Sequence, residues 1–216
     1  MKPRRALGLV KPRGLARRAL IELYLAGLDG RGLLLDELSS SLGLDEATCK
    51  ALVADLVEEG LVERRGDVFV LGQKGRESIR VVMTGGVFDI LHVGHLATLE
   101  AAKGLGDVLV VVVARDETVK RLKGREPLNR EEDRLKLVSA LKPVDKAILG
   151  DPEDFLKVVE LIGPDVIALG YDQKHDEKEL RRGLAERGLR ADIVRLNIHV
   201  PGVKSSKILA RLLREI

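Results

Sequence analysis

In IRVVMTGGVFDILHVGH, residues 79–95, an apolar run passes into two glycines and then into two histidines three residues apart. A short run rich in Val and Ile is typical of a strand that is buried on both faces. Gly85 and Gly86 predict a tight loop after that strand, and His92 and His95 stand where a helix should begin. The stretch therefore predicts the first strand, loop and helix of an α/β domain, with a ligand site at the carboxyl end of the strand.

The chain after residue 79 repeats this order of strand and helix. We expect strands at residues 79–86, 107–114, 145–150, 165–170 and 191–196, and helices at 95–105, 130–141, 154–162, 178–189 and 205–216. Nearly all strand residues are Val, Ile, Leu or Ala, which indicates a parallel sheet with helices on both faces. The fold class expected for residues 79–216 is α/β, a doubly wound, Rossmann-like parallel sheet.

Residues 1–78 have a different pattern. Apolar residues recur with a helical period at 15–26, and further helices are expected at 36–41 and from Asp45 to Gly60. Two short apolar segments then flank Arg65-Gly66-Asp67, a turn that suits a hairpin. Three helices followed by a hairpin predict a small winged helix-turn-helix domain. Segment 71–77, LGQKGRE, resembles the end of the wing in many archaeal winged-helix regulators.

The charges of residues 1–78 leave the role of this domain open. DNA binding would place the third helix in the major groove and Arg64 and Arg65 on the wing. The first 18 residues add seven basic side chains and no acidic one, namely Lys2, Arg4, Arg5, Lys11, Arg13, Arg17 and Arg18. The third helix is instead acidic, with Asp45, Glu46, Asp55, Glu58 and Glu59 against Lys50. The alternatives to DNA binding are a dimerisation or docking module, which would give a homodimer, and a purely structural appendage.

The composition of the 216 residues is that of a globular, densely charged protein. Apolar residues make up 45%, and the net charge of +3 is too small to prove a polyanion partner by itself. Few Asn and Gln, abundant Lys, Arg and Glu, and the single Cys49 are typical of a thermophilic, cytoplasmic protein. The longest apolar run, 108–114, is far shorter than a membrane span, and the basic N-terminus leads into no signal-peptide region, so no membrane partner is expected.

Phosphate binding explains the two histidines best. Glycine lets the loop backbone approach a phosphate closely, and backbone N–H groups with the start of the helix form an anion site. His92 and His95 lie on one face of the first turn and can reach the same phosphate, while Gly94 between them leaves room for a nucleotide. A zinc site would need more ligands than the nearby Asp89. The GxGxxG pattern of dinucleotide-binding proteins does not fit this sequence, because its glycines must follow a strand. The P-loop pattern is absent.

The stretch GGVFDILHVGH resembles the GTFDxxHxGH signature of the cytidylyltransferase-like nucleotidyltransferases. Further segments agree with this family from about Arg80 onward: VARDETVKRLKGREP at 113–127, REEDRLKLVSALKPVDKAILG at 130–150, LGYDQ at 169–173 and KSSKI at 204–208. The sequences ARDETVK and KPVDKAILG are most similar to those of the archaeal FAD synthases, which transfer AMP from ATP to FMN. The resemblance thus implies ATP and FMN as substrates, with Mg²⁺ bound through the ATP phosphates and no metal site built by the protein.

The resemblance also implies roles for individual residues. His92 and His95 would donate to the α- and β-phosphates beside the backbone of Gly86, Val87 and Phe88. Lys123 and Arg125, in the loop KGRE, would close over the triphosphate, and Arg134 would either bind phosphate or pair with Glu131. Asp172 would meet the ribose or base, and Ser205 and Ser206 would add donors at the start of the last helix.

Two departures from the family pattern bear on the substrate. Val87 replaces the signature threonine, which removes a hydroxyl but keeps the backbone N–H. His199 stands where cytidylyltransferases carry an arginine. The alternatives are a CTP-dependent enzyme that acts on a phospho-alcohol such as glycerol 3-phosphate, and a DNA-binding regulator whose nucleotidyltransferase domain serves only as a ligand sensor.

Overall fold

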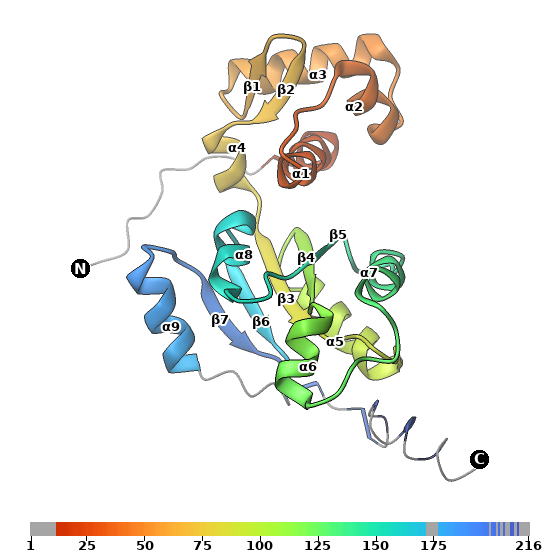
Figure 1. Ribbon diagram of the computed structural model, residues 1–216. Helices are drawn as coiled ribbons and strands as arrows, with labels where there is room; N and C mark the ends of the chain where they lie inside the picture. Colours follow the sequence, from red (N-terminus) through yellow and green to blue (C-terminus); the bar gives the residue numbers. More distant parts are fainter. Residues whose placement is uncertain are drawn as a thin grey trace. The chain divides into compact units, whose positions relative to one another are not determined.

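The computed structural model describes residues 12–171, 177–198, 200–201, 203, 205, 208–209 and 211. The chain forms two compact units that divide between Ile79 and Arg80. Figure 1 shows both units, and each is described by itself below.

The N-terminal unit contains the three predicted helices and the predicted hairpin. These are α1 (Gly14–Leu28), α2 (Leu35–Leu42), α3 (Glu46–Glu58) and the antiparallel strands β1 (Val62–Arg65) and β2 (Val68–Leu71). Gly66, in the two-residue turn between the strands, has a φ of +63°, a conformation that glycine adopts without strain. Leu20, Leu23, Leu38 and Val53, which are at most 2% exposed, form its core.

A short helix, α4 (Gln73–Ser78), follows the hairpin where the sequence predicted the end of a wing. Local propensity gives little sign of it, because the helix has only six residues and contains Gly75. Gly75 is buried so close to β1 that a Cβ atom would lie 2.1 Å from the Leu61 carbonyl oxygen. Packing against the hairpin therefore accounts for α4 better than its own sequence does.

Asp45 caps the start of α3. The Asp45 carboxylate accepts hydrogen bonds from the backbone N–H of Thr48 at 2.9 Å and from its hydroxyl at 2.6 Å. We expect Asp45→Ala to lower the melting temperature of the N-terminal unit. Asp45→Asn should lower it much less, because asparagine also caps helices well. Thermal denaturation followed by circular dichroism measures both, and an equal loss in the two variants would contradict the capping role.

The effect of Asp45→Ala should also depend on pH. The hydrogen bond from the Thr48 hydroxyl, and then that from the Thr48 backbone, lower the pKa of Asp45 below its usual value. A depressed pKa in the folded state means that the stabilisation is present above the unfolded pKa of about 3.9 and is lost as the pH falls through the folded pKa. The difference between wild type and Asp45→Ala should therefore shrink below about pH 4.

The C-terminal unit contains a five-stranded, fully parallel sheet in the order β5-β4-β3-β6-β7. The strands are β3 (Val81–Gly86), β4 (Val108–Val113), β5 (Lys146–Leu149), β6 (Val166–Leu169) and β7 (Asp192–Arg195). The first strand, β3, lies in the middle, and the chain builds outward on one side through β4 and β5 and on the other through β6 and β7 (Figure 1). The strand order thus reverses between β3 and β6, which confirms the predicted doubly wound α/β fold.

The helices of this unit are α5 (Val93–Lys103), α6 (Asp116–Lys123), α7 (Glu131–Ser139), α8 (Phe155–Ile162) and α9 (Glu177–Glu186). Four of them were predicted. The helix α6 was not predicted, because Val119 is its one buried residue and no apolar stripe marks it. Most of the predicted helix at 205–216 lies outside the described residues.

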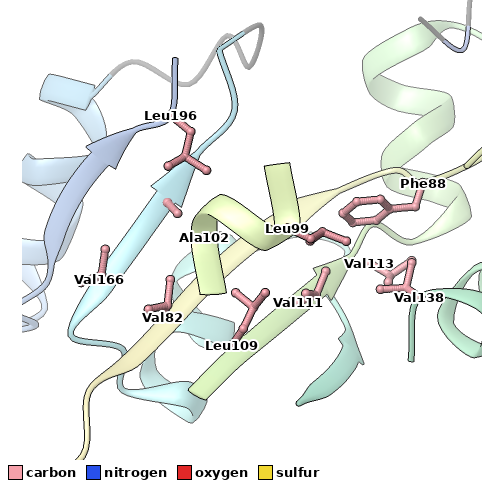
Figure 2. Packing of buried hydrophobic residues seen from close by; sticks show 11 residues of the cluster. Val82, Phe88, Leu99, Ala102, Leu109, Val111, Val113, Val138, Val166 and Leu196 are labelled. Atoms are coloured by element: carbon pink, nitrogen blue, oxygen red, sulfur yellow. The ribbon is translucent and has the colours of Figure 1, made fainter. Parts of the chain in front are cut away.

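The core of the C-terminal unit lies between the sheet and its helices. All six residues of β4 are buried, as expected for a central parallel strand. Figure 2 shows the main cluster, in which Leu99 and Ala102 of α5 pack over the strand residues Val82 and Leu109. Phe88, from the loop after β3, joins the same cluster beside Val113 and Val138 (Figure 2). This loop is therefore anchored in the core by its own aromatic side chain.

Candidate active site

The segment 85–95 lies at the carboxyl end of the central strand and contains the last two residues of β3, the loop 87–92 and the start of α5. We call it the signature loop. The neighbouring strand β6 is fixed to β3 here by the Thr84 hydroxyl, which donates to the Ala168 carbonyl at 2.8 Å. The loop therefore lies at the carboxyl ends of the strands, at the point of strand reversal where doubly wound folds bind ligands.

The structure brings His92 and His95 together as predicted. Their rings are stacked, with centroids 3.9 Å apart and planes inclined by 21°. His92 is the N-cap of α5, with an extended backbone at φ −153° and ψ 168°, and His95 lies on the first turn. Both imidazoles thus lie at the positively polarised end of α5, where an anion is favoured.

Gly94 lies against the ring of His92. A Cβ atom at this position would lie 3.0 Å from two atoms of the His92 ring. That Gly94 also leaves room for a nucleotide stays a prediction. Glycine at position 94 allows the His92 ring to lie back against the helix turn and stack on His95.

Phe88 has the one positive φ among the described non-glycine residues, +54°. Its ring covers Gly86 so closely that a Cβ atom there would lie 2.8 Å away, and its centroid is 5.4 Å from that of His95. The side chain is 6% exposed. Phe88 therefore contributes a wall to the histidine pair as well as backbone to the loop, and a strained backbone of this kind is common at functional sites.

The segment with Lys123 and Arg125 starts differently from the predicted loop. Lys123 is the last residue of α6, and Gly124 ends the helix in the left-handed conformation at φ +67°. Both basic side chains are exposed. The Arg125 guanidinium lies 3.5 Å from the Asp89 carboxylate, which brings it to the signature loop. Among the described residues, no hydrogen bond or ion pair joins Lys123 to that loop.

Asp89 is a site residue whose role the sequence analysis missed. Its side chain is 4% exposed and accepts hydrogen bonds from the backbone N–H groups of Leu128 at 2.8 Å and Asn129 at 3.0 Å. The Asn129 amide also donates to the Asp89 carbonyl at 2.5 Å. Asp89 thus holds the end of the 124–129 segment against the signature loop. Its position inside the signature was the one available sign of this role.

Arg134 matches neither of its two predicted roles. The side chain is completely buried, and it pairs with Asp116 at 2.6 Å, not with Glu131. Glu131 pairs with Arg115 at 2.6 Å and also accepts from the backbone N–H of Asp116 at 2.7 Å. None of the Arg134 side-chain surface is accessible, and its hydrogen bonds go to Asn129, Val87 and Asp116, so this conformation presents no Arg134 donor to a phosphate.

The C-terminal segment reaches the site through Ser205. Its hydroxyl donates to the Ile90 carbonyl of the signature loop at 3.1 Å. The predicted residues Asp172, His199 and Ser206 lie outside the described residues. Within the described part of the chain, no three His, Cys, Asp or Glu side chains gather in a way that could hold a metal ion. No helix among the described residues is long and apolar enough to span a membrane.

A glycine loop and paired imidazoles at the strand reversal of a parallel sheet are features of Rossmann-like nucleotidyltransferases. Residues 83–211 match the family described as cytidylyltransferase-like, and the chain belongs to this family. The match covers the complete signature loop, both segments that contact it and Ser205.

Curated relatives make the comparison more specific. An FAD synthase of Thermoplasma acidophilum is 49% identical over 135 residues, which are 62% of this chain and 94% of the relative. An FAD synthase of Pyrococcus abyssi is 47% identical over 141 residues, 64% of this chain and 95% of the relative. These matches confirm the resemblance seen in the sequence. Both relatives are shorter than this chain, since almost their whole length is aligned to less than two thirds of it.

A solved structure agrees with the fold. A crystal structure from Thermoplasma volcanium, described as a lipopolysaccharide core biosynthesis protein, superposes with a TM-score of 0.55 and 50% sequence identity. The match covers 56% of this chain and 99% of the other.

Proposed function

We propose that the protein is an FAD synthase, which transfers AMP from ATP to FMN and releases pyrophosphate. The observation that carries the proposal is the identity of about half of the aligned residues to curated FAD synthases over nearly their whole length. The intact histidine pair favours an active enzyme over a sensor without catalysis. Because ATP and FMN are cytoplasmic metabolites, the proposal includes a cytoplasmic location.

The proposed reaction is an in-line displacement at the α-phosphorus of ATP. An oxygen of the FMN phosphate forms a new bond to this phosphorus, and the bond to the oxygen that bridges to the β-phosphate breaks. Negative charge grows on the equatorial and bridging oxygens, so preorganised cationic and N–H donors lower the barrier. His92 and His95 at the start of α5 are the donors placed best for this charge, and the stacked rings can act on neighbouring phosphates.

The other site residues support binding of the phosphates. Arg125 is held near the loop by Asp89, and it would face the triphosphate together with Lys123. The Ser205 hydroxyl, bonded to the Ile90 carbonyl, lies on the same loop. We keep Asp172, His199 and Ser206 as proposed contacts to the nucleotide, on the ground of the family resemblance.

We propose that Mg²⁺ enters bound to ATP. The groups that surround the signature loop are imidazoles, a guanidinium and backbone N–H groups, and the buried Asp89 is already engaged by three donors. Such a donor set fits phosphate oxygens better than a bare cation, so the ion would be held by the phosphates and by water. When bound, it would neutralise charge on the triphosphate.

A substrate matrix tests the function. The purified protein is incubated with Mg²⁺ and either ATP or CTP, combined with either FMN or glycerol 3-phosphate, and both pyrophosphate and the nucleotide product are measured. Formation of FAD from ATP and FMN alone is expected. Turnover of CTP with glycerol 3-phosphate and none of ATP with FMN would replace the proposal by a cytidylyltransferase. Binding of nucleotide without turnover in any pair would favour a sensor.

For the N-terminal unit we propose a winged helix-turn-helix domain, supported by the order of α1, α2, α3 and the β1-β2 hairpin. If it binds DNA, the charges of residues 1–18, which are all basic, suit phosphates better than those of α3. The exposed face of α3 carries Glu46, Asp55 and Glu58, which phosphates repel. On the hairpin, Arg64 donates to the Gly66 carbonyl and Arg65 pairs with Glu63.

If the basic residues 1–18 bind DNA, the binding should be weak and salt-sensitive and should show no sequence preference. Neutralising six phosphates should make the affinity of the full-length protein for a duplex fall by roughly 10³-fold between 50 and 200 mM salt. Fluorescence anisotropy with two unrelated duplexes measures this, and addition of FAD tests whether ligand and DNA binding are coupled. A strong preference for one sequence would favour α3 as a recognition helix. No binding to either duplex would favour dimerisation, which sedimentation velocity would then show.

A further inference from the structure

Arg134 connects three segments that together surround the proposed phosphate site. Its Nη1 donates to the Val87 carbonyl of the signature loop at 2.6 Å, and its Nε donates to the Asn129 carbonyl at 3.0 Å. Its Nη2 donates to the Asp116 carboxylate at 2.6 Å. The side chain is 0% exposed, so the charge is compensated within the protein and not by water.

The bond to Val87 acts on the conformation of the next residue. The Val87 carbonyl belongs to the peptide plane that precedes Phe88, and φ of Phe88 is the rotation about the N–Cα bond that links this plane to the rest of the residue. Phe88 has a φ of +54°, which an L-residue adopts only when its surroundings impose it. Arg134 holds this peptide plane from one side, and Val138, four residues later on α7, belongs to the cluster that packs the Phe88 ring (Figure 2).

Phe88 in turn borders the histidine pair. Its ring centroid is 5.4 Å from that of His95, which stacks on His92 at 3.9 Å. If the Val87–Phe88 peptide rotated, Phe88 would leave the left-handed region and its ring would leave its place beside His95. A direct chain of contacts therefore runs from the guanidinium to the proposed phosphate donors, although Arg134 itself touches no substrate.

The two other bonds of Arg134 reach the segments that carry Lys123 and Arg125. Asp116 begins α6, the helix that ends at Lys123, and Asn129 ends the segment that contains Arg125. Asp89 connects the same segment to the signature loop through Leu128 and Asn129. Two buried side chains, the Arg134 guanidinium and the Asp89 carboxylate, thus connect the signature loop to the Lys123–Arg125 segment.

We propose that Arg134 is a positioning residue for nucleotidyl transfer: it fixes the left-handed Phe88 backbone that seats His95, and ties this loop to the α6 segment. The inference rests on the proposed function for its kinetic part, because only a reacting nucleotide needs these donors at fixed positions. A displacement of about 1 Å in such a group costs on the order of 10²-fold in rate.

The kinetic test uses Arg134→Lys, which keeps the charge opposite Asp116 but cannot span all three acceptors. We expect kcat to fall roughly 10- to 100-fold, with KM for ATP and FMN changed much less, since the residue contacts neither substrate. The matched control is Arg187→Lys, because Arg187 also bonds two acidic side chains, Asp154 and Glu160, but lies away from the site. Full kcat in a folded Arg134→Lys protein would overturn the proposal.

A double-mutant cycle tests whether Arg134 acts through the histidine. In the His95→Ala background, Arg134→Lys should lose most of its effect on kcat, because the group that it positions is gone. Fully additive effects would overturn this route. If Arg134→Lys does not fold, Asp116→Asn replaces it in both experiments, since it weakens the same connection from a side chain that is 33% exposed.

A spectroscopic readout keeps the inference separate from the proposed function. The chain has four histidines, so the imidazole Hε1 signals can be assigned by NMR with His92→Ala and His95→Ala. Without any nucleotide, Arg134→Lys should shift the His95 signal and Arg187→Lys should not. An unmoved His95 signal would overturn the positioning role. If the wild-type protein makes no FAD, the function proposal fails, and this spectrum still decides for or against Arg134.

Discussion

Replacement of His95 by alanine is expected to lower kcat for FAD formation by about 10²- to 10³-fold, the usual cost of losing one donor to a transition-state oxyanion. The same range is expected for His92→Ala, because its ring stacks on that of His95 at the start of α5. Folding should be nearly unaffected, since both side chains are only partly buried and α5 keeps its buried residues Leu99 and Ala102. Steady-state pyrophosphate release measures kcat, and thermal denaturation measures stability.

The double variant distinguishes shared from separate roles. If both imidazoles act on the same transition state as one unit, His92→Ala and His95→Ala together should cost less than the product of the single effects. Leu161→Ala is a suitable control, because this residue of α8 is 57% exposed and outside the site, and its kcat should equal that of the wild type. A histidine variant with full turnover would remove that side chain from the mechanism.

The sequence predicts most of the fold because the relevant interactions are local or periodic. The strand β4 is an uninterrupted run of six buried residues, and such runs identify parallel strands. The helix α6 escaped prediction because Val119 alone is buried, and α4 because its packing against Leu61 involves a glycine. In both cases, contacts with residues distant in the sequence override a weak local signal.

The site divides in the same way. The proximity of His92 and His95 could be predicted because they are three residues apart on one short segment. Arg134 could not be placed, because its acceptors Val87 and Asp116 lie 47 and 18 residues away, and an arginine in a charged helix usually faces water. The left-handed backbone of Phe88 has no sequence sign at all, since phenylalanine does not favour it.

Phe88→Ala is expected to lower the free energy of unfolding of the C-terminal unit by about 3–5 kcal/mol, the usual cost of removing a buried aromatic ring. The ring is 6% exposed and lies in the main core cluster near Val113 and Val138 (Figure 2). Because domains of this kind have a total stability of about 5–15 kcal/mol, the variant should be close to unfolding under mild denaturant. Urea denaturation measures the loss, and kcat should also fall, since His95 loses its neighbour.

Comparison with Phe88→Gly separates the packing of the ring from the conformation of the backbone. Both variants remove the ring, so the transfer and cavity costs are nearly equal. At an ordinary position glycine is less stable than alanine by about 0.5–1 kcal/mol, because it has more freedom to lose on folding. At a φ of +54° alanine is strained and glycine is not, so the order should reverse and Phe88→Gly should be the more stable of the two. If alanine is the more stable, Phe88 does not hold a left-handed backbone in solution, and Arg134 has no such conformation to maintain.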